Sequence, residues 1–176
     1  LAIAQMYLMG VSTRKVASIT RELCGESVSS TQVSNLASEL DSQLASFRER
    51  DLEQVDVLYL DARYEKVRID SKVIDCAVLV ASGVSKLGKR EILGVSVELS
   101  EAEVHWRNFL KSLLARGMSG VKLIVSDDHT GLKAARKSVL PSVPWQRCLF
   151  HFCQNAQSYV PKVEMRAEVA RAIKDI

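Results

Sequence analysis

Short runs of hydrophobic residues mark out the middle of the chain. Residues 57–60 are all apolar and lead directly into Asp61, and residues 121–125, mostly apolar, lead through Ser126 into Asp127. Runs this short, rich in Val, Leu and Ile, are typical of sheet strands covered on both faces. We therefore expect each aspartate at the carboxyl end of a buried strand, where the two side chains can face each other across neighbouring strands. The alternative is that each aspartate only caps the next turn.

Three further runs predict strands over residues 77–81, 91–97 and 145–150. The links between the Asp61 strand and the first two of these are short. Short links favour an antiparallel meander.

Two stripes of apolar residues at helical spacing predict helices between the later strands. The stripe over residues 106–114 follows Ser100 and Glu103, which have the spacing of a capping box. The stripe over residues 132–140 ends at Pro141, which stops a helix because it has no N–H to donate. The remaining tail reads as helix interrupted at Pro161.

The first fifty residues lack a convincing strand and predict three helices. One begins at the N-cap Ser12 and ends at Gly25, and a longer one begins with a capping box between Ser29 and Gln32. This order of a helix, a turn that contains glycine and a second helix suits a helix-turn-helix unit. In such a unit the second helix presents polar side chains to the edges of the bases. A small structural helical bundle fits the pattern equally well. The candidate base-contacting residues are Thr31, Gln32, Ser34, Asn35 and Ser38, and the candidate phosphate contacts are Arg14, Lys15 and Arg21.

Charged residues 47–54 predict a linker, with the boundary near residue 52. The expected organisation is a helical region 1–51, a core 52–151 and a helical tail 152–176. In the core, the order strand, strand, strand, helix, strand, helix, strand is that of the ribonuclease H-like fold, an α/β (α+β) fold with a mixed sheet and flanking helices. That order puts Asp61 and Asp127 where this fold carries two carboxylates. Carboxylates that converge in this way suit Mg²⁺, and two such ions support phosphoryl transfer at a DNA phosphate.

Composition narrows the class of protein only slightly. The 176 residues are 47% hydrophobic and 26% charged, values typical of a folded globular protein. A net charge of +3 is compatible with nucleic acid but does not identify a partner. No apolar run approaches the roughly 20 residues of a membrane span, and the start lacks the charged region of a signal peptide, so the cytoplasm is expected. The initial Leu1 hints at a piece of a longer protein.

Several ordered motifs resemble those of the Mutator-type bacterial insertion-sequence transposases of the Asp-Asp-Glu class. They are Tyr7-x-x-Gly10-x-Ser12-x-Arg14, Leu60-Asp61-Ala62-x-Tyr64-x-Lys66-x-Arg68, Arg90-Glu91-Ile92-Leu93-Gly94, Trp106, Arg116-Gly117, Ser126-Asp127-x-x-x-Gly131-Leu132 and Gln146-x-Cys148-x-x-His151. The resemblance covers nearly the whole chain. It implies that Asp61 and Asp127 are the first and second catalytic carboxylates and hold Mg²⁺ or Mn²⁺.

The same resemblance implies the partners. The helical region would bind the terminal inverted repeats of the element, and the protein would act on these and on target DNA, as a homo-oligomer at the bacterial nucleoid. Two departures from the family pattern stand out. Asp128 occupies a position where the family usually has Gly, which leaves the choice between Asp127 and Asp128 open, although Asp127 directly ends the apolar run. Cys153-Gln154-Asn155 stands where Arg-Asn follows the histidine.

A third carboxylate is harder to place. Glu164, with Glu168 one turn further on, is the local candidate. The family, however, inserts a helical segment after the Cys-x-x-His strand and places its catalytic Glu well beyond it. Residues 152–176 would then begin that insertion, and this chain alone would be inactive.

The pair Cys148 and His151 also suggests zinc, but a structural zinc site needs four ligands, and only Cys153 and His129 offer support. We expect instead that Cys148 and His151 neighbour the active site. Two other functions compete with a transposase. One is a catalytically inactive DNA-binding remnant or regulator, and the other is a cellular nuclease of the same fold.

Overall fold

The structure, a computed structural model, describes every residue of the chain except 1–2, 4–5, 7–9, 26–27, 70–71 and 175–176. These residues form two compact units, Leu1–Arg50 and Asp51–Ile176. The predicted division into a DNA-binding region, a catalytic core and an insertion is a functional assignment and stays a prediction.

Among its described residues, the first unit has two helices that pack on each other, α2 (Thr13–Cys24) and α3 (Ser30–Glu49). Both predicted starts are confirmed: the Ser12 hydroxyl accepts from the Lys15 N–H, and Ser29 and Gln32 form a reciprocal capping box. Gly25 ends α2 with a φ of 72°, which glycine adopts without strain. The third predicted helix falls largely on residues outside those described.

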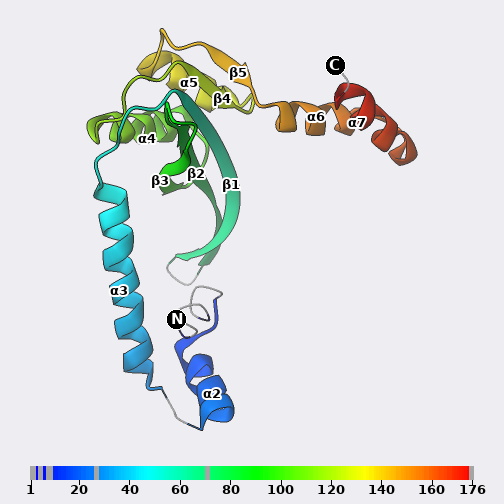
Figure 1. Ribbon diagram of the computed structural model, residues 1–176. Helices are drawn as coiled ribbons and strands as arrows, with labels where there is room; N and C mark the ends of the chain where they lie inside the picture. Colours follow the sequence, from blue (N-terminus) through cyan, green and yellow to red (C-terminus); the bar gives the residue numbers. More distant parts are fainter. Residues whose placement is uncertain (1–2, 4–5, 7–9, 26–27, 70–71, 175–176) are drawn as a thin grey trace. The chain divides into compact units, whose positions relative to one another are not determined.

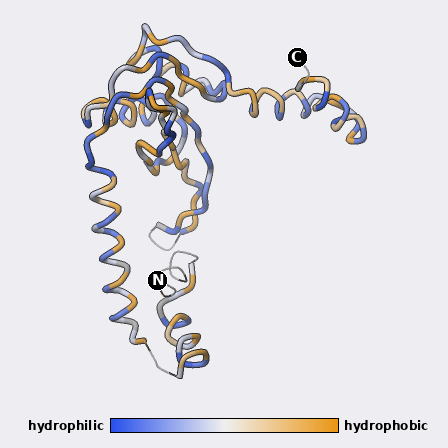
Figure 2. Tube along the Cα trace, in the orientation of Figure 1, coloured by the Kyte–Doolittle hydropathy of each residue, from blue (hydrophilic) through white to orange (hydrophobic). Residues whose placement is uncertain are grey.

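The apolar contact between these helices is small. Val16 of α2 and Val33 of α3 are almost fully buried. Figure 2 shows hydrophobic and hydrophilic residues alternating along α3, as expected for a helix with one packed face. The predicted linker starts too early, because α3 continues to Glu49 and the Arg50 guanidinium lies 5.0 Å from the centre of the Phe47 ring.

The second unit is built on a five-stranded mixed sheet in the order β3-β2-β1-β4-β5 (Figure 1). The strands are β1 (Val57–Ile69), β2 (Lys72–Val84), β3 (Arg90–Glu98), β4 (Leu123–Ser126) and β5 (Trp145–Arg147). Strands β1, β2 and β3 form the predicted antiparallel meander, while β4 runs parallel to β1 and β5 runs parallel to β4. This order and these directions are those of the ribonuclease H-like fold, so the predicted fold class is confirmed.

The predicted ends of β1 and β5 are wrong, and β2 is longer at both ends than the predicted run 77–81. Strand β1 does not end at Asp61 but continues to Ile69, because its second half pairs along its whole length with β2. Its parallel pairing with β4 does stop there, at the pair Leu60 and Ser126. Strand β5 ends at Arg147 and not at residue 150, because Cys148 takes the N-cap position of α6, which begins at Leu149.

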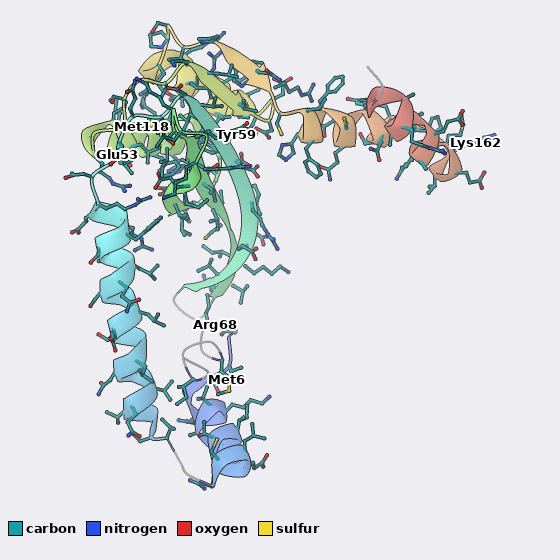
Figure 3. All side chains as sticks on the ribbon, viewed as in Figure 1. Met6, Glu53, Tyr59, Arg68, Met118 and Lys162 are labelled. Atoms are coloured by element: carbon teal, nitrogen blue, oxygen red, sulfur yellow. The ribbon has the colours of Figure 1, made fainter. Side chains whose placement is uncertain are left out.

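Helices α4 (Glu103–Ala115) and α5 (Thr130–Val139) contact each other and pack on the sheet to form the core. The predicted stripe on α4 is confirmed, with Trp106, Phe109, Leu110 and Leu113 all buried. Met118, labelled in Figure 3, follows this helix and is also buried. The capping box predicted for α4 is wrong, because Ala102 occupies the N-cap position and Glu103 pairs with Arg107.

We expect Trp106→Ala to lower the free energy of unfolding by about 3–5 kcal/mol, because it removes the largest fully buried side chain and leaves a cavity. Urea denaturation measures this change. Val104→Ala on the exposed side of the same helix is the control and should stay within about 0.5 kcal/mol of wild type. Equal losses in the two variants would contradict this account of the core.

After β5 the chain continues as α6 (Leu149–Ser158), a short 3₁₀ helix η1 (Val163–Met165) and α7 (Arg166–Lys174). The predicted interruption at Pro161 is confirmed. Among the described helices, none is both long and apolar enough to cross a membrane.

Candidate active site

Asp61 and Asp127 lie side by side at one edge of the β1–β4 contact. The last paired residues of the two parallel strands are Leu60 and Ser126, and each aspartate is the next residue. The Asp61 side chain is 64% exposed, whereas a carboxylate oxygen of Asp127 accepts from the His129 N–H at 3.3 Å. Ser126 anchors the strand end, since its buried hydroxyl accepts from the Trp145 indole N–H at 3.0 Å. The sheet therefore places two carboxylates together, one of them open to solvent.

Asp128 is engaged elsewhere. Its carboxylate pairs with Lys133 and lies 3.8 Å from the Arg147 guanidinium. The hydrogen bond from Lys133 is the main cause that lowers the pKa of Asp128 below its usual range, and the charges of Lys133 and Arg147 act in the same direction. Lys133 and Arg147 thus stabilise the ionised form of Asp128 and keep it engaged. This favours Asp127 as the second carboxylate of the site beside Asp61.

The Cys148 and His151 motif brings a histidine to Asp61. Cys148 follows β5 and caps α6, so that His151 falls in the first turn of that helix. His151 Nε2 lies 3.8 Å from a carboxylate oxygen of Asp61, while its buried Nδ1 has no hydrogen-bond partner in the described part of the chain. The imidazole is therefore close enough to orient Asp61 when protonated or to contact a group bound beside it.

Glu101 is a carboxylate near this pair that the sequence reasoning missed. It lies in the loop between β3 and α4, its side chain is only 13% exposed, and it is 3.8 Å from His129 Nδ1. Burial is the main cause that raises the pKa of Glu101, the charges of Asp127 and Asp61 raise it further, and His129 and Trp106 oppose the shift. Strands β1 and β3 are both antiparallel to β2, so they run in the same direction. The predicted meander could therefore have indicated that a residue just after β3 lies at the same edge of the sheet as Asp61.

The chemistry of these donors suits a divalent cation. Carboxylate oxygens are the ligands that Mg²⁺ prefers, and proteins commonly hold it with one or two carboxylates plus waters and substrate phosphates. Asp61 and Asp127 supply that number. Outside the undescribed segments, no group of three or more His, Cys, Asp or Glu side chains could enclose a metal ion by itself. The residues present therefore fit Mg²⁺ or Mn²⁺ bound jointly with substrate and water.

The predicted DNA-contacting residues lie on the two helices of the first unit. Arg14, Lys15 and Arg21 are exposed on α2, and Thr31, Gln32 and Asn35 are exposed near the start of α3. Gln32 also caps its own helix, because its side-chain oxygen accepts a hydrogen bond from the Ser29 N–H at 2.8 Å. The Thr31 and Asn35 side chains make no hydrogen bond within the described part of the chain, so they are the better candidates for contacts with bases.

Comparison with known proteins decides the family. Residues 1–176 match the family described as "Transposase, Mutator family". The chain belongs to the Mutator family of transposases. It is 54% identical to the transposase for insertion sequence element IS406 of Burkholderia multivorans, over 100% of this chain and 46% of that protein. It is 38% identical to the transposase for IS256 in transposon Tn4001 of Staphylococcus aureus, over 98% of this chain and 44% of that protein.

The chain thus spans less than half the length of these Mutator family relatives. Among solved structures, it overlaps the magnesium-bound catalytic core domain of HTLV-2 integrase with a TM-score of 0.37 and 11% identity, over 70% of this chain and 85% of that one. An overlap this weak supports no conclusion about function.

Proposed function

We propose that the protein is the transposase of an insertion element, which cleaves DNA at the element ends and joins them to target DNA by two-metal phosphoryl transfer. One observation carries the proposal: Asp61 and Asp127 lie next to each other at the edge of a ribonuclease H-like sheet in a Mutator family chain. A divalent cation bound there would activate a water or a 3′-hydroxyl and stabilise the leaving oxygen.

In this reaction each site residue of the chain would have a separate role. Asp61, the more exposed carboxylate, would reach the cation and the DNA phosphate, while Asp127 is oriented by the His129 N–H. His151 would orient the Asp61 carboxylate from α6. The catalytic Glu of the class would come from beyond this region, as the family resemblance implies, and no contact among the described residues brings Glu164 of η1 or Glu168 of α7 to Asp61 or Asp127. Residues 1–176 alone would then not cleave DNA.

A single assay separates this function from its competitors. Labelled DNA carrying the element ends is incubated with Mg²⁺ and the product of the complete reading frame that carries this chain. A transposase yields joined products, an inactive regulator binds the ends without cutting, and a nuclease releases hydrolysed DNA without a requirement for the ends. Absence of joined products under conditions that support end binding would overturn the proposal.

For the helical unit we propose binding to the terminal inverted repeats, with α2 on phosphates and the start of α3 at base edges. We also propose that the protein acts as a homo-oligomer, because the two element ends must be brought together before they are joined to target DNA.

Arg14→Ala or Arg21→Ala should weaken binding to all DNA sequences and reduce the salt dependence of the affinity by about one unit of log–log slope, because each removes one phosphate contact. Fluorescence anisotropy at several salt concentrations measures both quantities. Arg171→Ala, an exposed arginine on α7, is the matched control and should leave the slope unchanged. A loss confined to one DNA sequence would contradict a phosphate contact.

A further inference from the structure

A hollow of about 590 Å³ lies between the end of β5 and one side of α6, and its volume is within the range of small-ligand pockets in proteins. The residues that line it include Asp128, Arg147, Phe152, Asn155, Ser158 and Tyr159. Phe152, Asn155 and Tyr159 are spaced by three and four residues along α6 and its C-cap, so they share one face of the helix. His151, which precedes Phe152, lies 3.8 Å from Asp61. The hollow therefore begins within one helical turn of the residue that contacts the candidate active site.

Two aromatic side chains are open to solvent at this hollow. Phe152 is 44% exposed and Tyr159 is 86% exposed. The Arg147 guanidinium lies 5.4 Å from the centre of the Phe152 ring, within the range of a cation–π contact, so these two side chains form one wall together. In the described part of the chain, the Tyr159 ring contacts no other ring and its hydroxyl makes no hydrogen bond. Exposed rings of this kind are the platforms on which proteins stack the bases of single-stranded nucleic acid.

The polar groups of the hollow suit a nucleotide as well. The Asn155 backbone carbonyl accepts from the Ser158 hydroxyl at 2.6 Å, but the Asn155 side-chain amide makes no hydrogen bond among the described residues. That amide can therefore both donate to and accept from a bound base. Asp128 brings a negative charge, but Lys133 and Arg147 both pair with it, which leaves a net charge of +1 over these three side chains (+2 − 1). The lining is thus compatible with an anionic DNA strand.

We propose that this hollow binds one unpaired nucleotide of the DNA strand, next to the phosphate that reacts beside Asp61. The base stacks on Tyr159 and on the wall formed by Arg147 and Phe152, and the Asn155 amide hydrogen-bonds to the edge of the base. The nucleotide has to be unpaired, because a duplex covers both faces of each base with its neighbours and occupies the pairing edge. The inference rests on the proposed function and adds to it that the DNA is opened at the cleavage position.

The test compares two duplexes that carry the element end, one fully paired and one with mismatches at the cleavage position. Their affinities for the product of the complete reading frame are measured by fluorescence anisotropy without divalent cations, so that no cleavage occurs. The wild-type protein should bind the mismatched duplex about 5-fold or more tightly, because its base is free to stack and does not first have to be unpaired. Tyr159→Ala and Asn155→Ala should each reduce this preference and leave the affinity for the paired duplex close to wild type.

Two further variants are the controls. Tyr159→Phe keeps the aromatic ring and should therefore keep the preference for the mismatched duplex. Gln154→Ala is matched to Asn155→Ala, because Gln154 is the neighbouring exposed amide but lines a different hollow, together with Leu149 and Ala170. It should also keep the wild-type preference.

Each other outcome overturns the inference. Equal wild-type affinities for the two duplexes would exclude a bound unpaired nucleotide and leave the proposed function standing. A preference that survives in both Tyr159→Ala and Asn155→Ala would place that nucleotide elsewhere on the protein. Equal losses of affinity for both duplexes in Tyr159→Ala would mark a general contact with DNA. Failure of the wild-type protein to bind either duplex would overturn both the inference and the proposed function.

Discussion

Asp61→Asn should reduce strand transfer by the complete reading frame about 10³-fold or more, while binding of the element ends stays close to wild type. The asparagine keeps the shape of the side chain but removes a charge at the proposed cation site. A metal ion is worth several kcal/mol to a phosphoryl-transfer transition state, and each 1.36 kcal/mol corresponds to a tenfold change in rate. Joined products are quantified on a gel, and end binding is measured by anisotropy.

The control for Asp61→Asn is Asp75→Asn, an exposed aspartate on β2 that is far along the β1–β2 ribbon from the β4 contact. It should leave strand transfer intact. If Asp61→Asn lost DNA binding in proportion to strand transfer, the carboxylate would serve the binding of DNA and not the chemistry.

The second large effect separates two adjacent carboxylates. Asp127→Asn should abolish strand transfer as Asp61→Asn does, whereas Asp128→Asn should leave it nearly unchanged. The reason is geometric, because Asp127 adjoins Asp61 across the β1–β4 pair while Asp128 is engaged by Lys133 and Arg147. The two variants make the same chemical change one residue apart, so each controls for the other. The opposite ranking would assign the second carboxylate to Asp128.

The sequence predicts those parts of the fold that depend on local pattern. Apolar runs located the strands, and capping residues such as Ser12 and Ser29 located helix starts, because these signals depend on near neighbours in the chain. The adjacency of Asp61 and Asp127 also followed from pattern, since both leave apolar runs that pair in parallel.

Features that depend on distant partners escaped prediction. Strand β1 continues past Asp61 because β2 pairs with its second half, and residues 62–68, four of which are charged, contain no continuous apolar run that would signal a strand. Glu101 was not predicted as a site residue, because the spacing of Ser100 and Glu103 had already been interpreted as a helix capping box in the same segment. Its burial depends instead on the approach of α5 at Gly131, thirty residues later in the chain (131 − 101).

The most direct test of the central claim is a crystal structure of the protein with Mn²⁺, collected at a wavelength where manganese scatters anomalously. We expect an anomalous peak between the carboxylates of Asp61 and Asp127, close enough for both to coordinate the ion. We also expect Asp128 to remain paired with Lys133. With Mn²⁺ at saturating concentration, the absence of a peak there, or a peak held by other residues alone, would contradict the claim that these two aspartates form the cation site.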